Sequence, residues 1–78
     1  MDISRAENLY AMFAATSFNQ PLGGWDIRRA EVLSHMFLGA SSFNQPLGAW
    51  SIRPGASTEH MFLGATAFDR AANAPWYT

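Results

Sequence analysis

Two histidines are the residues of this 78-residue sequence whose type and spacing come closest to metal chemistry. His35 and His60 each precede a Met-Phe pair, one repeat period apart. Imidazoles from neighbouring repeats could share a zinc ion. However, equivalent helix positions in adjacent units would lie about 8–10 Å apart, too far for two nitrogens on one metal. With no cysteine and no third histidine, the sequence predicts no metal site and no cofactor.

The other arrangements that support catalysis are also missing from the sequence. Ser34 and His35 are adjacent, which does not by itself place them in hydrogen-bonding geometry. Asp26 and Glu31 have no reason to lie close together. There is no nucleotide-binding glycine motif, no nucleophile elbow and no His-Glu helix motif. We therefore expect no catalytic residues and a protein that is not an enzyme.

Three copies of one unit of 24 or 25 residues organise the chain. The segment Phe18–Trp25 returns almost unchanged as Phe43–Trp50, and a third copy from Phe68 to Trp76 keeps the Phe and the Trp but loses the Gln-Pro-Leu centre. Three further columns repeat with the same period: Ile3, Ile27 and Ile52; Met12, Met36 and Met61; Phe13, Phe37 and Phe62. The start Met1-Asp2-Ile3 is in phase with the later copies. We predict a single domain over residues 1–78, with repeats at about 1–24, 25–49 and 50–75, either complete or a segment of a longer array.

The middle unit indicates the structure of one repeat. Trp25–Arg28 alternates apolar and polar residues, as a short strand does. Ala30–Phe37 has the apolar spacing of a short helix, and Gly39 suits its end. Pro46 lies in a return loop. We expect an α/β stack with one short parallel strand and one short helix per unit, and a pure β-solenoid is the alternative. In the third unit, Pro54-Gly55 should delay or shorten the helix.

Side chains at equivalent positions should form columns along such a stack. Asn19, Asn44 and Asp69 should form a buried ladder of hydrogen bonds to the backbone of the neighbouring unit. The tryptophans share a strand face with the isoleucines, so we expect Trp25, Trp50 and Trp76 to be core residues, and the alternative is a role in stacking on a partner. The repeated methionines and phenylalanines should fill the core.

Bulk properties exclude some classes of function. The net charge is −1, which gives no electrostatic case for binding nucleic acid or anionic membrane. No segment approaches the roughly 20 apolar residues of a transmembrane helix. The first five residues do not resemble a signal peptide. Because cysteine is absent, the sequence does not indicate whether the protein works in an oxidising or a reducing compartment.

Two motifs resemble a known family. Phe-Asn-Gln-Pro-Leu-x-x-Trp occurs at residues 18–25 and 43–50, and Met-Phe-x-Gly-Ala occurs at 36–40 and 61–65. Together they resemble the bacterial surface-protein repeat of about 26 residues, known as the DUF285 or BspA-like family and related to leucine-rich repeats. The resemblance implies a right-handed, leucine-rich-repeat-like solenoid. It also implies a binding or adhesion module at the cell surface or outside the cell, with no catalytic residues.

The expected function is therefore a non-enzymatic repeat module that binds a protein or glycan partner at a surface. The alternative is a structural subunit or spacer, docked in a larger complex by the uncapped ends of the stack. Arg28, Arg29 and Arg53 could form a basic strip, although a solvated edge is the simpler interpretation. The candidate partner contacts are these arginines and the aromatic residues near the C-terminal end: Arg28, Arg29, Arg53, Trp76 and Tyr77.

Overall fold

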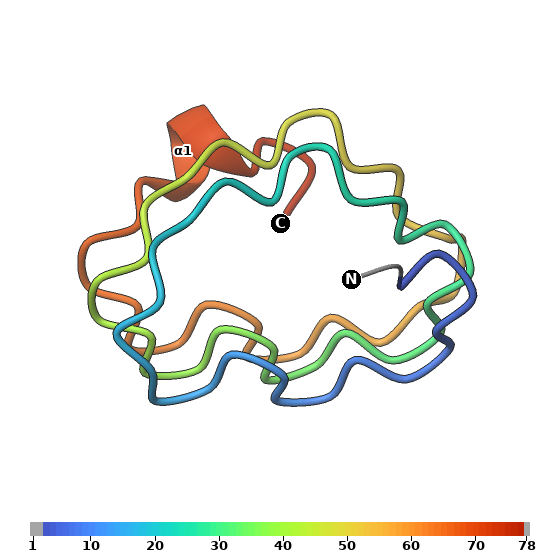
Figure 1. Ribbon diagram of the computed structural model, residues 1–78, viewed down its shortest axis with the longest axis horizontal. Helices are drawn as coiled ribbons and strands as arrows, with labels where there is room; N and C mark the ends of the chain where they lie inside the picture. The colour runs from blue at the N-terminus through green and yellow to red at the C-terminus, as the bar shows by residue number, and fades with distance from the viewer. Residues whose placement is uncertain (1–2, 78) are drawn as a thin grey trace.

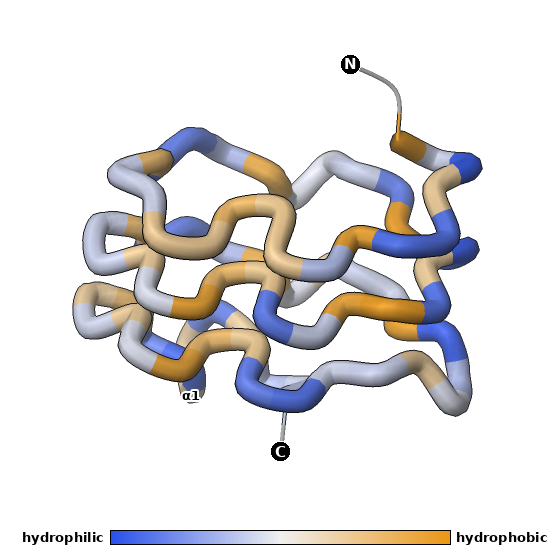
Figure 2. The backbone as a smooth tube through the Cα atoms, turned by 90° about the horizontal axis from the view of Figure 1, so that it is seen from below, coloured by the Kyte–Doolittle hydropathy of each residue, from blue (hydrophilic) through white to orange (hydrophobic). Residues whose placement is uncertain are grey.

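The protein is described by a computed structural model that covers residues 3–77, so the predicted start at Met1-Asp2 lies outside the described residues. The chain winds through three coils that lie one on another (Figures 1 and 2). We name them coil 1 (residues 3–25), coil 2 (26–50) and coil 3 (51–77). The result is a compact body of 28 × 22 × 22 Å.

Backbone hydrogen bonds join each coil to the next at every second residue. From coil 1 to coil 2, at N–O distances of 2.7–3.2 Å, the N–H groups of Leu9, Ala11, Phe13 and Ala15 donate to the carbonyls of Val32, Ser34, Met36 and Leu38. From coil 2 to coil 3, at 2.7–3.0 Å, the N–H groups of Leu33, His35, Phe37 and Gly39 donate to the carbonyls of Ser57, Glu59, Met61 and Leu63. The same four positions of the repeat therefore supply the N–H donors at both interfaces, between coils 1 and 2 and between coils 2 and 3.

Between these bonds the chain runs as a series of tight turns. In coil 2, the N–H of Met36 donates to the carbonyl of Leu33, and the N–H of Ala40 donates to that of Phe37. The third residues of these turns are His35 and Gly39, with φ of 61° and 68°, as a type II turn requires. Ala11, Ala15, His60 and Gly64 repeat this left-handed conformation in the other coils. A left-handed residue at every fourth position interrupts any helix, so the helix predicted over Ala30–Phe37 is wrong.

The predicted α/β solenoid, with its leucine-rich-repeat-like strand and helix in each unit, is also wrong. The only helix within residues 3–77 is α1, Arg70–Asn73. No sheet forms among these residues, because the parallel pairing is confined to two isolated bridges, Asn8 to Val32 and Val32 to Ser57. The turns on either side prevent neighbouring residues from extending the pairing. In place of the delayed helix expected at Pro54-Gly55 there is a turn closed from Ala56 N–H to the Arg53 carbonyl, with Gly55 at φ 85°.

Helix α1 accommodates the irregular third copy. The Asp69 side chain caps it by accepting from the Ala72 N–H at 3.2 Å. In coils 1 and 2, a turn is closed by a hydrogen bond from the N–H of Trp25 or Trp50 to the carbonyl of the leucine three residues earlier. The equivalent turn of coil 3 is closed from the Tyr77 N–H to the Ala74 carbonyl. The fully buried Ala74 therefore occupies the position of Leu22 and Leu47. The inserted helix lets coil 3 close over the core despite losing Gln-Pro-Leu.

Columns of side chains fill the space inside the coils. Phe37 stacks on Phe13 and Phe62 with centroids 5.5 and 5.4 Å apart, and Phe43 stacks on Phe18 and Phe68 at 6.4 and 5.6 Å. Met36 and Met61 are fully buried, so the predicted phenylalanine and methionine core is confirmed for coils 2 and 3. Met12, Phe13 and Phe18 of coil 1 are only partly buried.

The predicted asparagine ladder is confirmed, but it is exposed rather than buried. Asn19 Oδ1 accepts from the backbone N–H of Asn44 at 2.9 Å, and Asn44 Oδ1 accepts from that of Asp69 at 3.2 Å. Asn44 Oδ1 also accepts from Asn73 Nδ2 at 2.8 Å. The ladder therefore ties all three coils together and holds the end of α1 against coil 2.

Replacing Gly39 by alanine should lower the free energy of unfolding by about 1–2 kcal/mol, because its left-handed φ disfavours a Cβ. The added Cβ would meet Ala15 Cα at 3.8 Å, an ordinary contact, so the cost is conformational. The matched substitution Ala15→Gly should raise stability by roughly 0.5 kcal/mol, after glycine's entropy cost. Chemical denaturation measures both. Equal effects of the same sign would contradict the assigned turns.

Removing the Asn44 side chain tests the ladder. Asn44→Ala deletes an acceptor of two hydrogen bonds and should lower the free energy of unfolding by about 1 kcal/mol. Asn44→Asp keeps the acceptor oxygens and should retain most of that stability in moderate salt. Thermal unfolding compares the two, and identical losses would show that the ladder contributes nothing.

Candidate functional site

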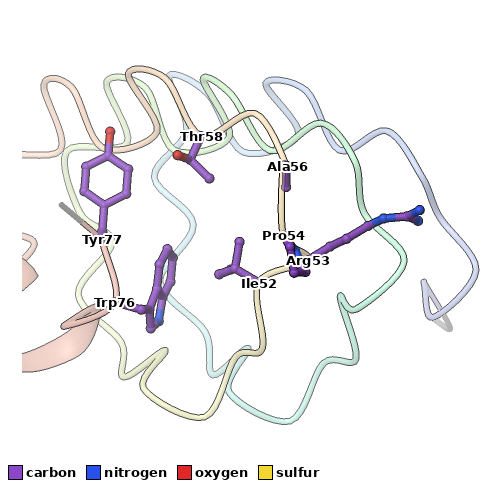
Figure 3. Close-up of a pocket in the computed structure, with 8 residues that line it drawn as sticks. Ile52, Arg53, Pro54, Ala56, Thr58, Trp76 and Tyr77 are labelled. Atoms are coloured by element: carbon purple, nitrogen blue, oxygen red, sulfur yellow. The ribbon is translucent and has the colours of Figure 1, made fainter.

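The end of coil 3 carries a hollow of about 250 Å³, which we name the end hollow (Figure 3). It is lined by Ile52, Arg53, Pro54, Gly55, Ala56, Thr58, Trp76 and Tyr77. Within residues 3–77 no further coil covers this end: Ile27 in coil 2 is 1% exposed, whereas its equivalent Ile52 is only partly buried. In Figure 3 the side chains of Ile52, Trp76 and Tyr77 point into the ring of coil 3.

Trp76 is held rigidly on the wall of the end hollow. Its Nε1 donates to the Leu47 carbonyl at 2.8 Å, just as Trp50 Nε1 donates to the Leu22 carbonyl at 2.9 Å. The two indoles stack with centroids 6.4 Å apart. Trp50 is 4% exposed, so the core prediction is confirmed for that residue. Trp25 and Trp76, at the two ends of the column, are partly buried.

Tyr77 lies across the end of the phenylalanine column. Its ring meets Phe62 edge to face at 5.2 Å and Trp76 at 6.2 Å. The guanidinium carbon of Arg70, from α1, lies 5.3 Å from the centre of the Tyr77 ring, within the range of a cation–π interaction. This cover explains why Phe62 is 6% exposed although it ends its column.

Of the five predicted contacts, the structure brings Arg53, Trp76 and Tyr77 together at the end hollow. Only the aromatic side chains turn into it, since the Arg53 side chain leads away (Figure 3). The Arg53 guanidinium lies 3.9 Å from a carboxylate oxygen of Glu31, an exposed and weak pair. The hollow therefore combines aromatic and apolar side chains with a lining whose exposed surface is more polar than apolar, and the Thr58 hydroxyl is one of its polar groups.

The predicted basic strip does not gather at this site. Arg28 makes a two-pronged contact with Asp26: Nε lies 2.9 Å from Oδ1 and Nη2 lies 3.0 Å from Oδ2. The hydrogen bonds from the Arg28 side chain and backbone lower the pKa of Asp26 from 3.8 to about 2. The Arg28 guanidinium is thus paired with the Asp26 carboxylate two residues away. Arg29 and Arg53 are exposed, and neither side chain points into the hollow (for Arg53, Figure 3).

The two histidines lie closer together than expected. Their ring centroids are 5.4 Å apart and edge to face, and Tyr10 continues the column 5.0 Å from His35. The expected 8–10 Å was wrong because adjacent coils are joined by backbone hydrogen bonds, which set a spacing of about 4.8 Å. His35 Nδ1 is buried without a partner. No group of three or more potential metal-binding side chains clusters in the part of the chain that is described.

Sequence reasoning missed the left-handed residues that shape the coils. The Gly of each Met-Phe-x-Gly motif carried part of the signal, since Gly39 and Gly64 adopt this conformation. Histidine is also enriched at positive φ, but Ala11 and Ala15 give no such indication. Asp69, which caps α1, was recognised only as a ladder residue.

These features define a small repeat protein with an aromatic hollow at one end. The chain belongs to the DUF285 family: the family model described as "Mycoplasma protein of unknown function, DUF285" matches residues 1–76. Neither a curated protein nor a solved structure matches the chain. None of the helical structure in residues 3–77 has the length and apolar content to cross a bilayer.

Replacing Arg28 by alanine should return the Asp26 pKa from about 2 toward 3.8, because the hydrogen bonds that favour its ionised form come mainly from the Arg28 side chain. A lowered folded-state pKa stabilises the fold above pH 3.8, and this stabilisation is lost as the pH falls through about 2. A carboxyl-detected NMR titration measures the change. An unaltered pKa in Arg28→Ala would show that the pair is absent in solution.

Proposed function

We propose that this chain is a non-enzymatic interaction module that binds a protein or glycan partner through the end hollow. The observation that carries the proposal is the placement of Trp76 and Tyr77 on one wall of a hollow whose floor includes Ile52 (Figure 3). Aromatic rings combine a large apolar area with little conformational entropy, so they recur as anchors in protein and sugar recognition. Trp76 is already fixed by its hydrogen bond to Leu47.

The chemistry of the lining supports binding rather than catalysis. None of the eight lining residues is an Asp, Glu or His, the groups that most often move protons in active sites. Thr58 supplies a hydroxyl, and its backbone N–H donates no hydrogen bond within residues 3–77. Polar groups of this kind orient a ligand without transforming it.

The location of the partner is part of the proposal. The Phe-Asn-Gln-Pro-Leu and Met-Phe-x-Gly-Ala motifs resemble the BspA-like repeats of bacterial surface lipoproteins and adhesins. A surface-exposed module would meet glycans and foreign proteins, the ligands for which rigid aromatic walls are suited. We therefore place this chain at a cell surface or outside the cell.

The proposal is tested by screening the whole chain against an oligosaccharide array and a displayed random-peptide library, with hits quantified by tryptophan fluorescence. Tyr77→Ala should weaken binding of a true hit by about tenfold, the equivalent of 1.4 kcal/mol.

The matched control is Tyr10→Ala. Tyr10 is 54% exposed and packs beside His35, away from the end hollow. Its removal should leave affinity unchanged. A ligand that binds equally well to Tyr77→Ala, or that is lost equally with Tyr10→Ala, would refute the end hollow as the binding site.

A further inference from the structure

The two ends of the stack carry backbone groups that no other described residue pairs. At the coil 1 end, the acceptor edge consists of the carbonyls of Asn8, Tyr10, Met12 and Ala14, which accept no hydrogen bond within residues 3–77. At the coil 3 end, the donor edge consists of the N–H groups of Thr58, His60, Phe62 and Gly64, which donate none. One end therefore offers four acceptors and the other offers four donors.

The two edges match because they are the same positions of one repeat. Inside the protein, N–H groups at the donor positions of one coil bind carbonyls at the acceptor positions of the next, at 2.7–3.2 Å. The free N–H groups of coil 3 in one copy can thus donate to the free carbonyls of coil 1 in another copy, as the N–H groups of coil 1 donate to the carbonyls of coil 2. An unpaired edge of this kind is a template for another chain.

Side chains at the ends extend the match. The Leu22 carbonyl accepts from both the Trp25 N–H and Trp50 Nε1. Its equivalent at the far end, the Ala74 carbonyl, accepts only from the Tyr77 N–H, and Trp25 Nε1 has no acceptor within the described residues. The indole N–H and the carbonyl with a single partner belong to opposite ends, as a continued stack requires. Ala74 is fully buried, so its carbonyl can accept from another copy only when the residues that cover it move aside.

We propose that the chain binds a second copy of itself head to tail, with the donor edge of one copy on the acceptor edge of the next. This inference goes beyond the proposed function: the donor edge borders the end hollow at Thr58, and its partner is a second copy of the chain rather than the protein or glycan ligand that Tyr77 would anchor. Each added copy leaves one edge of each kind free, so growth is open-ended rather than closed at a dimer. The net charge of −1 opposes this assembly little.

Tyr77 restrains the assembly. Its ring covers Phe62 and is itself covered by Arg70, so it occupies the end of the column on which Phe13 of the next copy would stack. Within the protein, Phe13 and Phe62 each stack on Phe37 at about the same separation, 5.5 and 5.4 Å. Continuing the column requires Tyr77 to turn aside, and its removal should strengthen self-association.

Sedimentation velocity from micromolar to millimolar concentration tests the proposal on the full chain. The average mass of the wild type should rise with concentration beyond that of a dimer, and Tyr77→Ala should lower the dissociation constant at least tenfold. Because Tyr77 is partly buried against the core, the fold of Tyr77→Ala is verified by circular dichroism. If both stay monomeric throughout, or stop at a closed dimer, the proposal is overturned.

A matched pair of blocking variants tests the direction of assembly. Ile3 and Ile52 are the partly buried end members of one column, so Ile3→Arg should block the acceptor face and Ile52→Arg the donor face. With the fold of each verified by circular dichroism, each should be monomeric alone, whereas their equimolar mixture should form a dimer and nothing larger. The control Ser41→Arg, exposed on the middle coil, should behave as the wild type.

Two results would contradict head-to-tail binding: association that neither arginine variant reduces, and a mixture that stays monomeric while the wild type assembles. Failure here is distinguishable from failure of the proposed function. A chain that stays monomeric but binds a glycan or peptide through Tyr77 refutes only the self-association. A chain that assembles while Tyr77→Ala leaves every other ligand unaffected refutes only the binding role of the end hollow.

Discussion

Backbone hydrogen bonds between successive coils are the interaction on which the rest of this structure depends. Four N–H groups of one coil donate to four carbonyls of the next, and the pattern is the same at both interfaces. Alternate residues supply these bonds because tight turns direct every second N–H along the stack. These turns require residues with a left-handed backbone conformation, such as His35 and Gly39. Regular secondary structure is thereby replaced by a repeated chain of turns.

The spacing that these bonds impose explains the packing of side chains. Coils joined by backbone hydrogen bonds lie about 4.8 Å apart, so identical side chains lie in register and their rings stack. The phenylalanine columns, the indole hydrogen bonds to leucine carbonyls and the asparagine ladder all repeat with this spacing. The same repeat also makes the two ends of the stack differ from its middle, because end residues have a neighbouring coil on one side only. A side chain that is buried in coil 2, such as Ile27, is partly open at its equivalent in coil 3.

The sequence predicted the columns better than it predicted the backbone. Leu33, Met36, Phe37 and Ala40 have helical spacing and are all fully buried, but a series of tight turns buries these positions as well as a helix does. Apolar spacing alone could not separate the two, and only the left-handed Gly39 and His35 distinguish them. The Asn19 and Asn44 columns were predictable because a polar residue that recurs with the repeat has an equivalent neighbour to bind.

The candidate site was predictable in part. Trp76 and Tyr77 were identified because they end the last copy of the repeat, and both line the end hollow. The hollow itself lies where no other coil within residues 3–77 covers Ile52, and no local motif in the sequence encodes it. The pairing of Arg28 with Asp26 was not predicted, because it depends on the local turn that brings together two residues only two positions apart in the sequence.

Amide hydrogen exchange at a concentration where the chain is monomeric tests the coil-to-coil bonding most directly, because the four equivalent amides of coils 2 and 3 differ only in whether a following coil accepts their hydrogen bonds. The account predicts strong protection of the amides of Leu33, His35, Phe37 and Gly39, and fast exchange of those of Thr58, His60, Phe62 and Gly64. Equal protection of the two sets, or fast exchange of both, would contradict it.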